Sequence, residues 1–187
     1  MRTFFCLELE ERAKEGLARV AEELRRRSPA RVTWVSRENL HITLRFLGEI
    51  NPELIPELRA AAELAVDGLG RFKVRLDRLG AFPEPSRARV IWAGSTAPPQ
   101  ELLRLYHALE EQLEALSFPP EGKPYTPHVT LGRVKERDRA KVAALAGELG
   151  KIASFSFETE AQGLTLMEST LTPSGAIYKP VFRVEFH

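Results

Sequence analysis

Cysteine is almost absent from this sequence, since Cys6 is the only one in 187 residues. An intrachain disulfide is therefore excluded, which is typical of proteins from a reducing compartment. No apolar run approaches the roughly 20 residues that a membrane-spanning helix needs. Glu8 and Glu10 interrupt the amino-terminal apolar stretch, unlike in a signal peptide. These absences predict a cytoplasmic protein that does not enter a membrane, with Cys6 as a buried structural residue rather than a nucleophile.

An excess of charge of either sign is also missing. The formal net charge is +1, with 43% apolar and 28% charged residues, as in ordinary soluble globular proteins. Any affinity for a phosphate polymer must therefore come from locally placed arginine and lysine. The length suits one well-buried domain, and we predict a single domain over residues 1–187, built from two intimately packed lobes. We predict no protein partner and expect a monomer.

Hydrophobic periodicity predicts an α+β fold. Apolar residues recur at helical spacing in 10–27, 52–66, 98–116 and 137–149. Strands are predicted at 2–9, 32–35, 40–47, 72–79, 89–93, 128–134, 155–160, 163–169 and 177–186. Long antiparallel strands with helices on one face make an α+β architecture. Because the order of histidine-bearing strand, helix and further strands occurs twice, we infer a duplicated unit.

One short motif, histidine-aliphatic-threonine-leucine, occurs twice in the chain. It begins at His41 and again at His128, although the chain has only four histidines. In a β-strand, residues two apart share a face roughly 6–7 Å apart. Each motif therefore directs its imidazole and its threonine hydroxyl, Thr43 or Thr130, to one face and two aliphatic side chains to the other. Two matched motifs predict two halves of the molecule that face one site. His107 and His187 are predicted to lie on the surface.

Three interpretations of the paired motifs compete. A single strand histidine is usually structural, but the matched repeat makes a purely structural duplication less favoured. A zinc site would need a third ligand nearby, yet neither motif has an adjacent histidine, cysteine or glutamate at metal-binding spacing. Threonine hydroxyls are poor zinc ligands and good donors to phosphate oxygens. The residues therefore favour an anion site, and we predict neither a metal nor a cofactor.

A phosphodiester suits this set of side chains. The unperturbed pKa of histidine, about 6.5, allows one imidazole to act as a base while a protonated partner acts as an acid. Hydroxyls of Thr43 and Thr130 that point at non-bridging oxygens would stabilise the negative charge that grows at phosphorus.

The motifs and their flanks resemble the 2H phosphoesterases. The resemblance is carried by LHITLRFLGE at 40–49 and TPHVTLGR at 126–133, and extends to the opening strand at 2–5 and the closing segment at 178–181. Within that superfamily, the chain is similar to the bacterial and archaeal RNA 2′,3′-cyclic phosphodiesterases, also called 2′-5′ RNA ligases. The resemblance implies a bilobal, pseudo-twofold fold in which two antiparallel sheets line a central groove and the helices lie outside.

The resemblance also implies an activity. RNA ends with a 2′,3′-cyclic phosphate would be hydrolysed to 2′-phosphomonoesters without metal or nucleotide cofactor, and the reverse reaction would form a 2′-5′ linkage without ATP. By analogy, His128 would activate water and His41 would protonate the departing 3′ oxygen, while Thr43 and Thr130 would hold the phosphate. The division of the two roles rests on the analogy alone.

Two arginines follow the motifs. The resemblance makes Arg133 a contact to the substrate phosphate, although strict alternation puts it on the face opposite His128. A β-bulge at Gly132 would re-aim it, and without a bulge it would be a structural ion-pair partner. If alternation continues, Arg45 lies on the face of His41 and is a second candidate.

Other functions stay open at this stage. The same site could act on 2′-5′ oligonucleotides or on a cyclic phosphate of an ADP-ribose derivative. A non-catalytic module that binds RNA or a nucleotide is the alternative without an enzyme. The intact histidine and threonine of both motifs favour catalysis.

Overall fold

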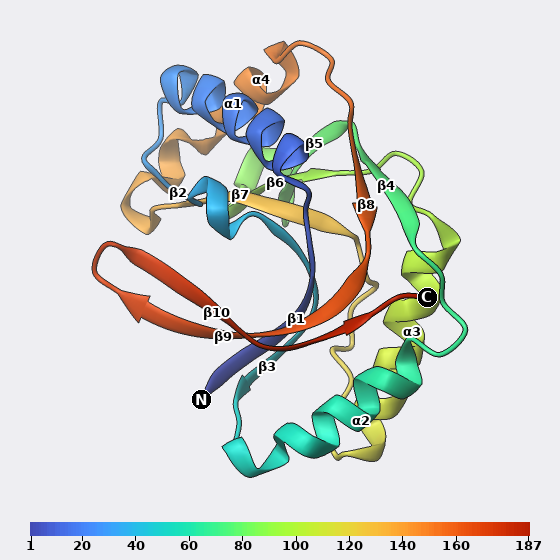
Figure 1. Cartoon of the computed structure of the whole chain (residues 1–187). Coiled ribbons are helices and arrows are strands. Elements are labelled where there is room, and N and C mark those ends of the chain that lie inside the picture. The colour runs from blue at the N-terminus through green and yellow to red at the C-terminus, as the bar shows by residue number, and fades with distance from the viewer.

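The computed structural model describes the side chains of residues 1–135, 138 and 140–187. Two antiparallel sheets are built from strands β1 to β10 and are packed against helices α1 to α4 (Figure 1). The predicted α+β class is confirmed. The helices are α1 (Glu11–Arg27), α2 (Ile55–Ala65), α3 (Gln100–Ala115) and α4 (Val142–Lys151). The strands are β1 (Arg2–Glu8), β2 (Val32–Trp34), β3 (His41–Glu49), β4 (Phe72–Leu76), β5 (Arg78–Phe82), β6 (Val90–Gly94), β7 (His128–Val134), β8 (Phe157–Ala161), β9 (Gly163–Thr172) and β10 (Gly175–Glu185).

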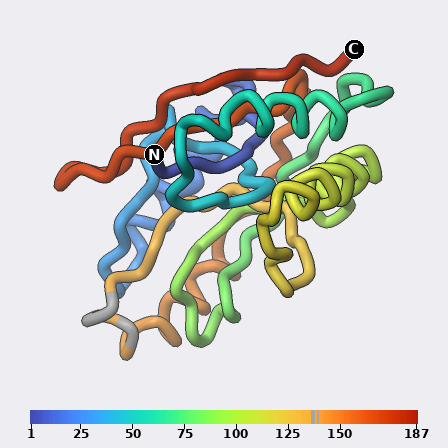
Figure 2. Tube along the Cα trace, turned by 90° about the horizontal axis from the view of Figure 1, so that it is seen from below, coloured from blue at the N-terminus to red at the C-terminus, as the bar shows by residue number. Residues whose placement is uncertain are grey.

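The main sheet has eight strands in the order β10-β9-β1-β3-β7-β6-β5, and β2 also pairs with β7. The ladder between β3 and β7 consists of one residue pair, Ile42 with Val129. The sheet therefore divides at this pair into two four-stranded halves. One half contains β10, β9, β1 and β3, and the other contains β7, β6, β5 and β2. At the junction, each half contributes the strand that begins with a motif histidine, β3 or β7, which we call its histidine strand. These halves are not consecutive pieces of the chain, because the half with β3 contains both the first strand and the last two. Figure 2 shows β10 and α2 along one side of the molecule.

The same pattern of pairing occurs in both halves. In each half, the histidine strand has a β-bulge at the leucine of its motif. This leucine, Leu44 or Leu131, has no paired residue on β1 or β6. The matching pairs are Glu8–His41, Cys6–Thr43 and Phe5–Arg45 in one half, and Gly94–His128, Trp92–Thr130 and Ile91–Gly132 in the other. A bulge shifts the faces of all later residues in its strand. This repeated register is the structural form of the duplication that the sequence predicts.

Helices cover one face of the main sheet. The four aliphatic side chains of the motifs are buried in one core cluster with residues of α1, α2, α3 and α4. The leucine stripe of α3 packs there, and Leu102, Leu105, Leu109 and Leu113 are all buried. Each such side chain contributes roughly 1.5–3 kcal/mol by leaving water. We call the opposite face, which carries His41, Thr43, His128 and Thr130, the histidine face.

Three predicted elements differ from the structure. The stretch 52–66, expected as one helix, begins as a 3-10 turn (Pro52–Leu54) and becomes α-helical only in α2. The stretch 72–79, expected as one strand, contains β4 and the start of β5, which belong to different sheets. β4 pairs with β8, whereas β5 pairs with β6. The stretch 137–149, expected as one helix, begins as a 3-10 turn (Glu136–Lys141) and becomes α-helical only in α4. Side chains 136, 137 and 139 lie outside the described residues.

Gly132 is required by the close approach of β2 to β7. A Cβ at this position would lie 2.5 Å from Cγ1 of Val32 and 2.8 Å from Cε3 of Trp34. Both neighbours are stiff and partly buried. We expect Gly132→Ala to lower the free energy of unfolding by roughly 1–3 kcal/mol, through overpacking, in urea denaturation.

Gly147 supplies the control for this substitution. It lies in α4, and a Cβ there would meet nothing within 4 Å. Gly147→Ala should leave stability unchanged or raise it by about 0.5–1 kcal/mol, because alanine favours a helix interior. Equal stability of the two variants would contradict the close approach at Gly132.

Candidate active site

The two motifs meet on neighbouring strands. β3 and β7 run antiparallel and pair at Ile42 and Val129. One step along each strand from this pair brings His41 level with Thr130, and Thr43 level with His128. The motif aliphatics are at most 2% exposed, whereas the two histidines and two threonines are only partly buried. The structure thus brings all four predicted polar side chains to one face, with the histidines on a diagonal.

His41 is held by both of its ring nitrogens. Nδ1 lies 2.6 Å from the carbonyl oxygen of Asn39, and Nε2 lies 2.8 Å from Oγ1 of Thr43. A carbonyl only accepts, so Nδ1 carries the proton of the neutral ring and Nε2 accepts from the threonine hydroxyl. The Asn39 side chain donates to the carbonyl of Ala176 over 2.7 Å, which ties this turn to β10.

His128 is anchored in the same way. Its Nδ1 lies 2.7 Å from the carbonyl oxygen of Thr126. In both motifs, the anchoring carbonyl therefore belongs to the residue two positions before the histidine. The same tautomer follows, with Nε2 of each ring left to accept or receive a proton at the site.

Aromatic rings surround each imidazole. The ring of His41 stacks on Phe4 at 4.8 Å and meets the edge of Tyr178 at 5.4 Å between centroids. Sequence reasoning did not place these two rings around His41. No local pattern marks them, because they come from β1 and β10 and meet His41 only through the sheet.

The second imidazole has a similar environment. The ring centroid of His128 lies 4.9 Å from that of Phe82 and 6.1 Å from that of Trp92. The two aromatic residues lie on β5 and β6, in the other half of the sheet. Both histidines are therefore enclosed by apolar surface from their own half.

This burial disfavours the charged form of both rings. It lowers the pKa of His41 to about 4, with smaller contributions from the nearby charges of His128, Lys14 and Arg133, while the hydrogen bond to Asn39 opposes the shift. Burial also lowers the pKa of His128, as does Arg133. Both imidazoles are therefore neutral near pH 7 in the free protein.

Arg133 lies on the histidine face. The bulge at Leu131 reverses the alternation, so that Leu131 and Gly132 are both buried and Arg133 is exposed. Its positive charge lowers the pKa of His41, of His128 and of Tyr178. Arg133 thus lies on the same face of the sheet as both histidines, and its positive charge acts on each of them.

The expectation that Arg45 shares the face of His41 is wrong. The matching bulge at Leu44 turns Arg45 to the opposite side, where it is 5% exposed. Its guanidinium pairs with both carboxylate oxygens of Glu110 at 2.7 and 2.8 Å and donates to the carbonyl of Pro119. The position that corresponds to Arg133 is occupied by Phe46, which is 39% exposed.

A partly buried tyrosine links the two motifs. The hydroxyl of Tyr125 donates to the carbonyl of Thr43 over 3.0 Å, and its ring stacks on Tyr106 at 4.1 Å between centroids. Tyr125 directly precedes Thr126, whose carbonyl orients His128. The segment before the second motif is thereby fixed against the backbone of the first.

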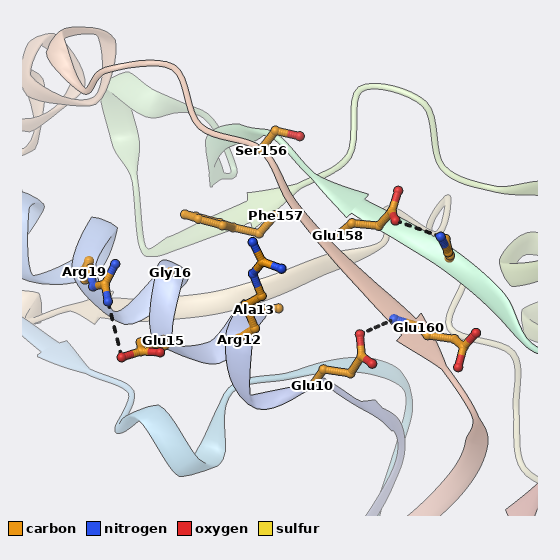
Figure 3. A pocket seen from close by; sticks show the side chains of 11 residues that line it. Glu10, Arg12, Ala13, Glu15, Gly16, Arg19, Ser156, Phe157, Glu158 and Glu160 are labelled. Atoms are coloured by element: carbon orange, nitrogen blue, oxygen red, sulfur yellow. Dashed lines mark hydrogen bonds and ion pairs between the residues drawn. The ribbon is translucent and has the colours of Figure 1, made fainter.

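The hollow beside His41 is small. Its volume is about 210 Å³, and Lys14, Tyr178 and Met167 are among the residues that line it. A larger hollow of about 850 Å³ lies between α1 and β8 (Figure 3) and includes no residue of either motif. Some of its charged groups pair with each other, as Lys73 with Glu158 at 3.2 Å. The side chains of the two motifs, rather than the volume of a hollow, therefore mark the candidate site.

The side chains described by the structure contain no group of three histidine, cysteine, aspartate or glutamate residues that could hold a metal ion. The hydroxyls and the arginine at the site instead suit an anion. No described helix is both long and apolar enough to span a membrane.

Comparison with known proteins shows the family of this chain. A family model described as LigT like Phosphoesterase matches residues 7–92 and 94–178, so each matched stretch contains one histidine motif. The chain belongs to the LigT-like phosphoesterase family. The family that the motifs predicted is thereby confirmed, and the chain is a phosphoesterase of this family.

Relatives and solved structures cover nearly the whole chain. A Methanocaldococcus jannaschii protein named RNA 2′,3′-cyclic phosphodiesterase is 35% identical over 97% of this chain and 98% of its own length. The Thermotoga maritima protein of that name is 33% identical, over 100% of this chain and 96% of its own. The Thermus thermophilus protein TT0787 has a TM-score of 0.80 at 27% identity, with 100% of this chain and 98% of that chain covered. E. coli LigT complexed with 3′-AMP has a TM-score of 0.75 at 26% identity, with 99% and 97% covered.

The low pKa of His41 makes stability depend on pH. Because the folded ring titrates near 4 and an unfolded one near 6.5, the unfolded chain binds more protons between these values. The contribution of His41 to the free energy of unfolding should therefore be fully present above about pH 6.5. It should decrease as the pH falls, so that the protein loses up to about 3 kcal/mol of stability towards pH 4. Urea denaturation across this range should show less of this decline in His41→Gln than in the parent chain.

His107→Gln is the control, since His107 is exposed on α3. It should keep the parent dependence on pH. An equal decline in the parent chain and in His41→Gln would show that His41 is not buried as a neutral ring.

Proposed function

We propose that this phosphoesterase hydrolyses 2′,3′-cyclic phosphates at RNA ends to 2′-phosphomonoesters, without a metal ion. The observation that carries the proposal is the diagonal pair His41 and His128, each anchored at Nδ1 and each beside a threonine of its own and of the other motif. Two such groups can deliver and remove a proton on opposite sides of one phosphorus. The names of the relatives supply the cyclic phosphate of RNA as the substrate.

In the proposed reaction, neutral Nε2 of His128 takes a proton from water as the water oxygen forms a bond to phosphorus. The bond from phosphorus to the 3′ oxygen breaks, and protonated Nε2 of His41 gives its proton to that oxygen. The product carries the phosphate on the 2′ oxygen. The same sequence with a 5′-hydroxyl in place of water forms a bond from the 5′ oxygen to phosphorus, breaks the bond to the 3′ oxygen and joins two RNA ends through a 2′-5′ linkage.

The acid is formed when substrate binds. In the free protein, His41 is neutral and accepts a hydrogen bond from Thr43. An anionic phosphate next to the ring favours its charged form and raises its pKa. Once protonated, Nε2 no longer accepts, and the Thr43 hydroxyl is free to donate to a phosphate oxygen.

Two further donors, Thr130 and Arg133, join Thr43 in this arrangement. Thr130 lies level with His41 across the junction, and Arg133 lies near both histidines. We assign Thr43, Thr130 and Arg133 to the non-bridging oxygens, where charge grows in the transition state. Such donors are most effective when they are already oriented, as they are on strands.

Replacing either histidine should remove most of the activity. We expect His41→Ala and His128→Ala each to lower kcat for a 2′,3′-cyclic nucleotide by about 10²–10⁴-fold, because each removes a proton-transfer group. Phosphorus NMR in excess EDTA should show the 2′-nucleotide as the product of the parent chain. His107→Ala is the matched control and should keep full activity. Full activity of either site variant, loss of activity in EDTA or a 3′-nucleotide product would each contradict the mechanism.

The threonine hydroxyls give a separate test. Thr130→Val keeps the shape of the side chain and removes its donor, so we expect kcat to fall by about 10²-fold. Thr130→Ser restores a hydroxyl and should recover most of the activity. Steady-state kinetics of the two variants decide the point, and similar rates would show that Thr130 does not contact the phosphate.

A further inference from the structure

Arg78 lies on the histidine face, two strands away from His128. The register pairs Arg78 with Gly94, and Gly94 with His128, so the three form one row across β5, β6 and β7. Directly paired residues share a face of a sheet. Neighbouring strands are about 4.8 Å apart, so the backbones of Arg78 and His128 are separated by about 10 Å.

The ring of Trp92 covers the sheet between Arg78 and His128, and we call it the floor of this region. The ring of Trp92 lies against the sheet between two glycines, where a Cβ on Gly80 would be 2.2 Å from Cζ2 and a Cβ on Gly94 would be 2.7 Å from Cζ3. Only glycine allows the ring to lie there. Phe82 packs beside it, with 5.1 Å between ring centroids, and also contacts His128. The indole is 5% exposed and is therefore fixed in position.

The guanidinium of Arg78 rests on this floor. Its Cζ atom is 5.0 Å from the centroid of the Trp92 ring, a cation–π contact. Arg78 is exposed, and the structure shows no ion pair or hydrogen bond from it to any described residue. The contact orients a planar, permanently charged group and leaves its N–H donors available, which suits a phosphate.

The opposite side of the site offers a less suitable cation. Lys14 lies near His41, but its ammonium is 3.5 Å from the carbonyl of Glu38 and 3.7 Å from the carboxylate of Glu11. Glu8 and Glu38 also line the small hollow that Lys14 faces. An additional anion would meet balanced charge there, whereas Arg78 has no acidic partner among the described residues.

We propose that Arg78, held on Trp92, binds the phosphodiester next to the reacting cyclic phosphate. The chain of an RNA substrate would then pass over β6 and β5, and the protein would select an RNA oligonucleotide over a free cyclic nucleotide, which has no second phosphate. This inference rests on the proposed function, because it places the reacting phosphate between the two motifs.

The test compares two substrates in Arg78→Gln. For a trinucleotide that ends in a 2′,3′-cyclic phosphate, kcat/KM should fall about tenfold relative to that for 2′,3′-cyclic AMP, mainly through KM, because one charge-assisted contact is lost. Binding of the trinucleotide product with a 2′-phosphate, measured by fluorescence anisotropy, should weaken similarly. The slope of the logarithm of its affinity against the logarithm of salt concentration should decrease by about 0.7, as expected for one phosphate of a single strand.

Arg104→Gln is the matched control, because Arg104 is exposed on α3, which packs on the other face of the sheet. It should change neither the ratio of kcat/KM for the two substrates nor the salt dependence of product binding. An unchanged ratio in Arg78→Gln, an equal loss on both substrates, or the selective loss in Lys14→Gln instead would each overturn the inference. Failure of the parent chain to hydrolyse either substrate would contradict the proposed function, whereas the product-binding measurement still reports on Arg78.

Discussion

The site depends on a single backbone junction, the pairing of Ile42 with Val129 between β3 and β7. This pair sets the register that places each histidine beside the threonine of the other motif. A slip of one residue would turn the polar side chains into the core and the aliphatic ones out. So short a ladder needs support from elsewhere, and two contacts supply it. Arg45 of β3 donates to the carbonyl of Pro119, in the segment before β7, and Tyr125 of that segment donates to the carbonyl of Thr43.

The environment of the histidines connects their burial to the chemistry that we propose. Aromatic rings from each half surround the imidazoles, and this burial lowers both pKa values. Each carbonyl anchor fixes the neutral tautomer and directs Nε2 to the shared face. The free protein therefore holds two potential bases. In the proposed reaction, the phosphate brings the negative charge that stabilises a protonated ring, so that substrate binding and protonation of His41 are coupled.

The paired bulges explain why alternation succeeds within the motifs and fails directly after them. Up to the threonine, the period of two correctly separates polar from aliphatic side chains. Leu44 and Leu131 then stay unpaired in the register, and the following residues change face. As a result, Arg45 becomes a buried clamp while Arg133 reaches the histidine face. Similarly, 72–79 reads as one strand because both of its parts alternate, although the chain passes from one sheet to the other between Leu76 and Arg78.

The α+β class, nearly all elements and the four polar residues of the motifs could be predicted from the amino-acid sequence, because they follow from local periodicity and from a repeat of rare residues. The sequence also indicated the family, since two motifs with their flanks are specific. The order of the strands, the positions of the bulges and the aromatic rings around the histidines became known only from the folded chain. These features arise from backbone pairing between residues far apart in the chain, as between Phe4 and Phe46 or between Trp92 and Thr130. No local pattern records such pairings, because their energy is shared between segments that meet only in the folded chain.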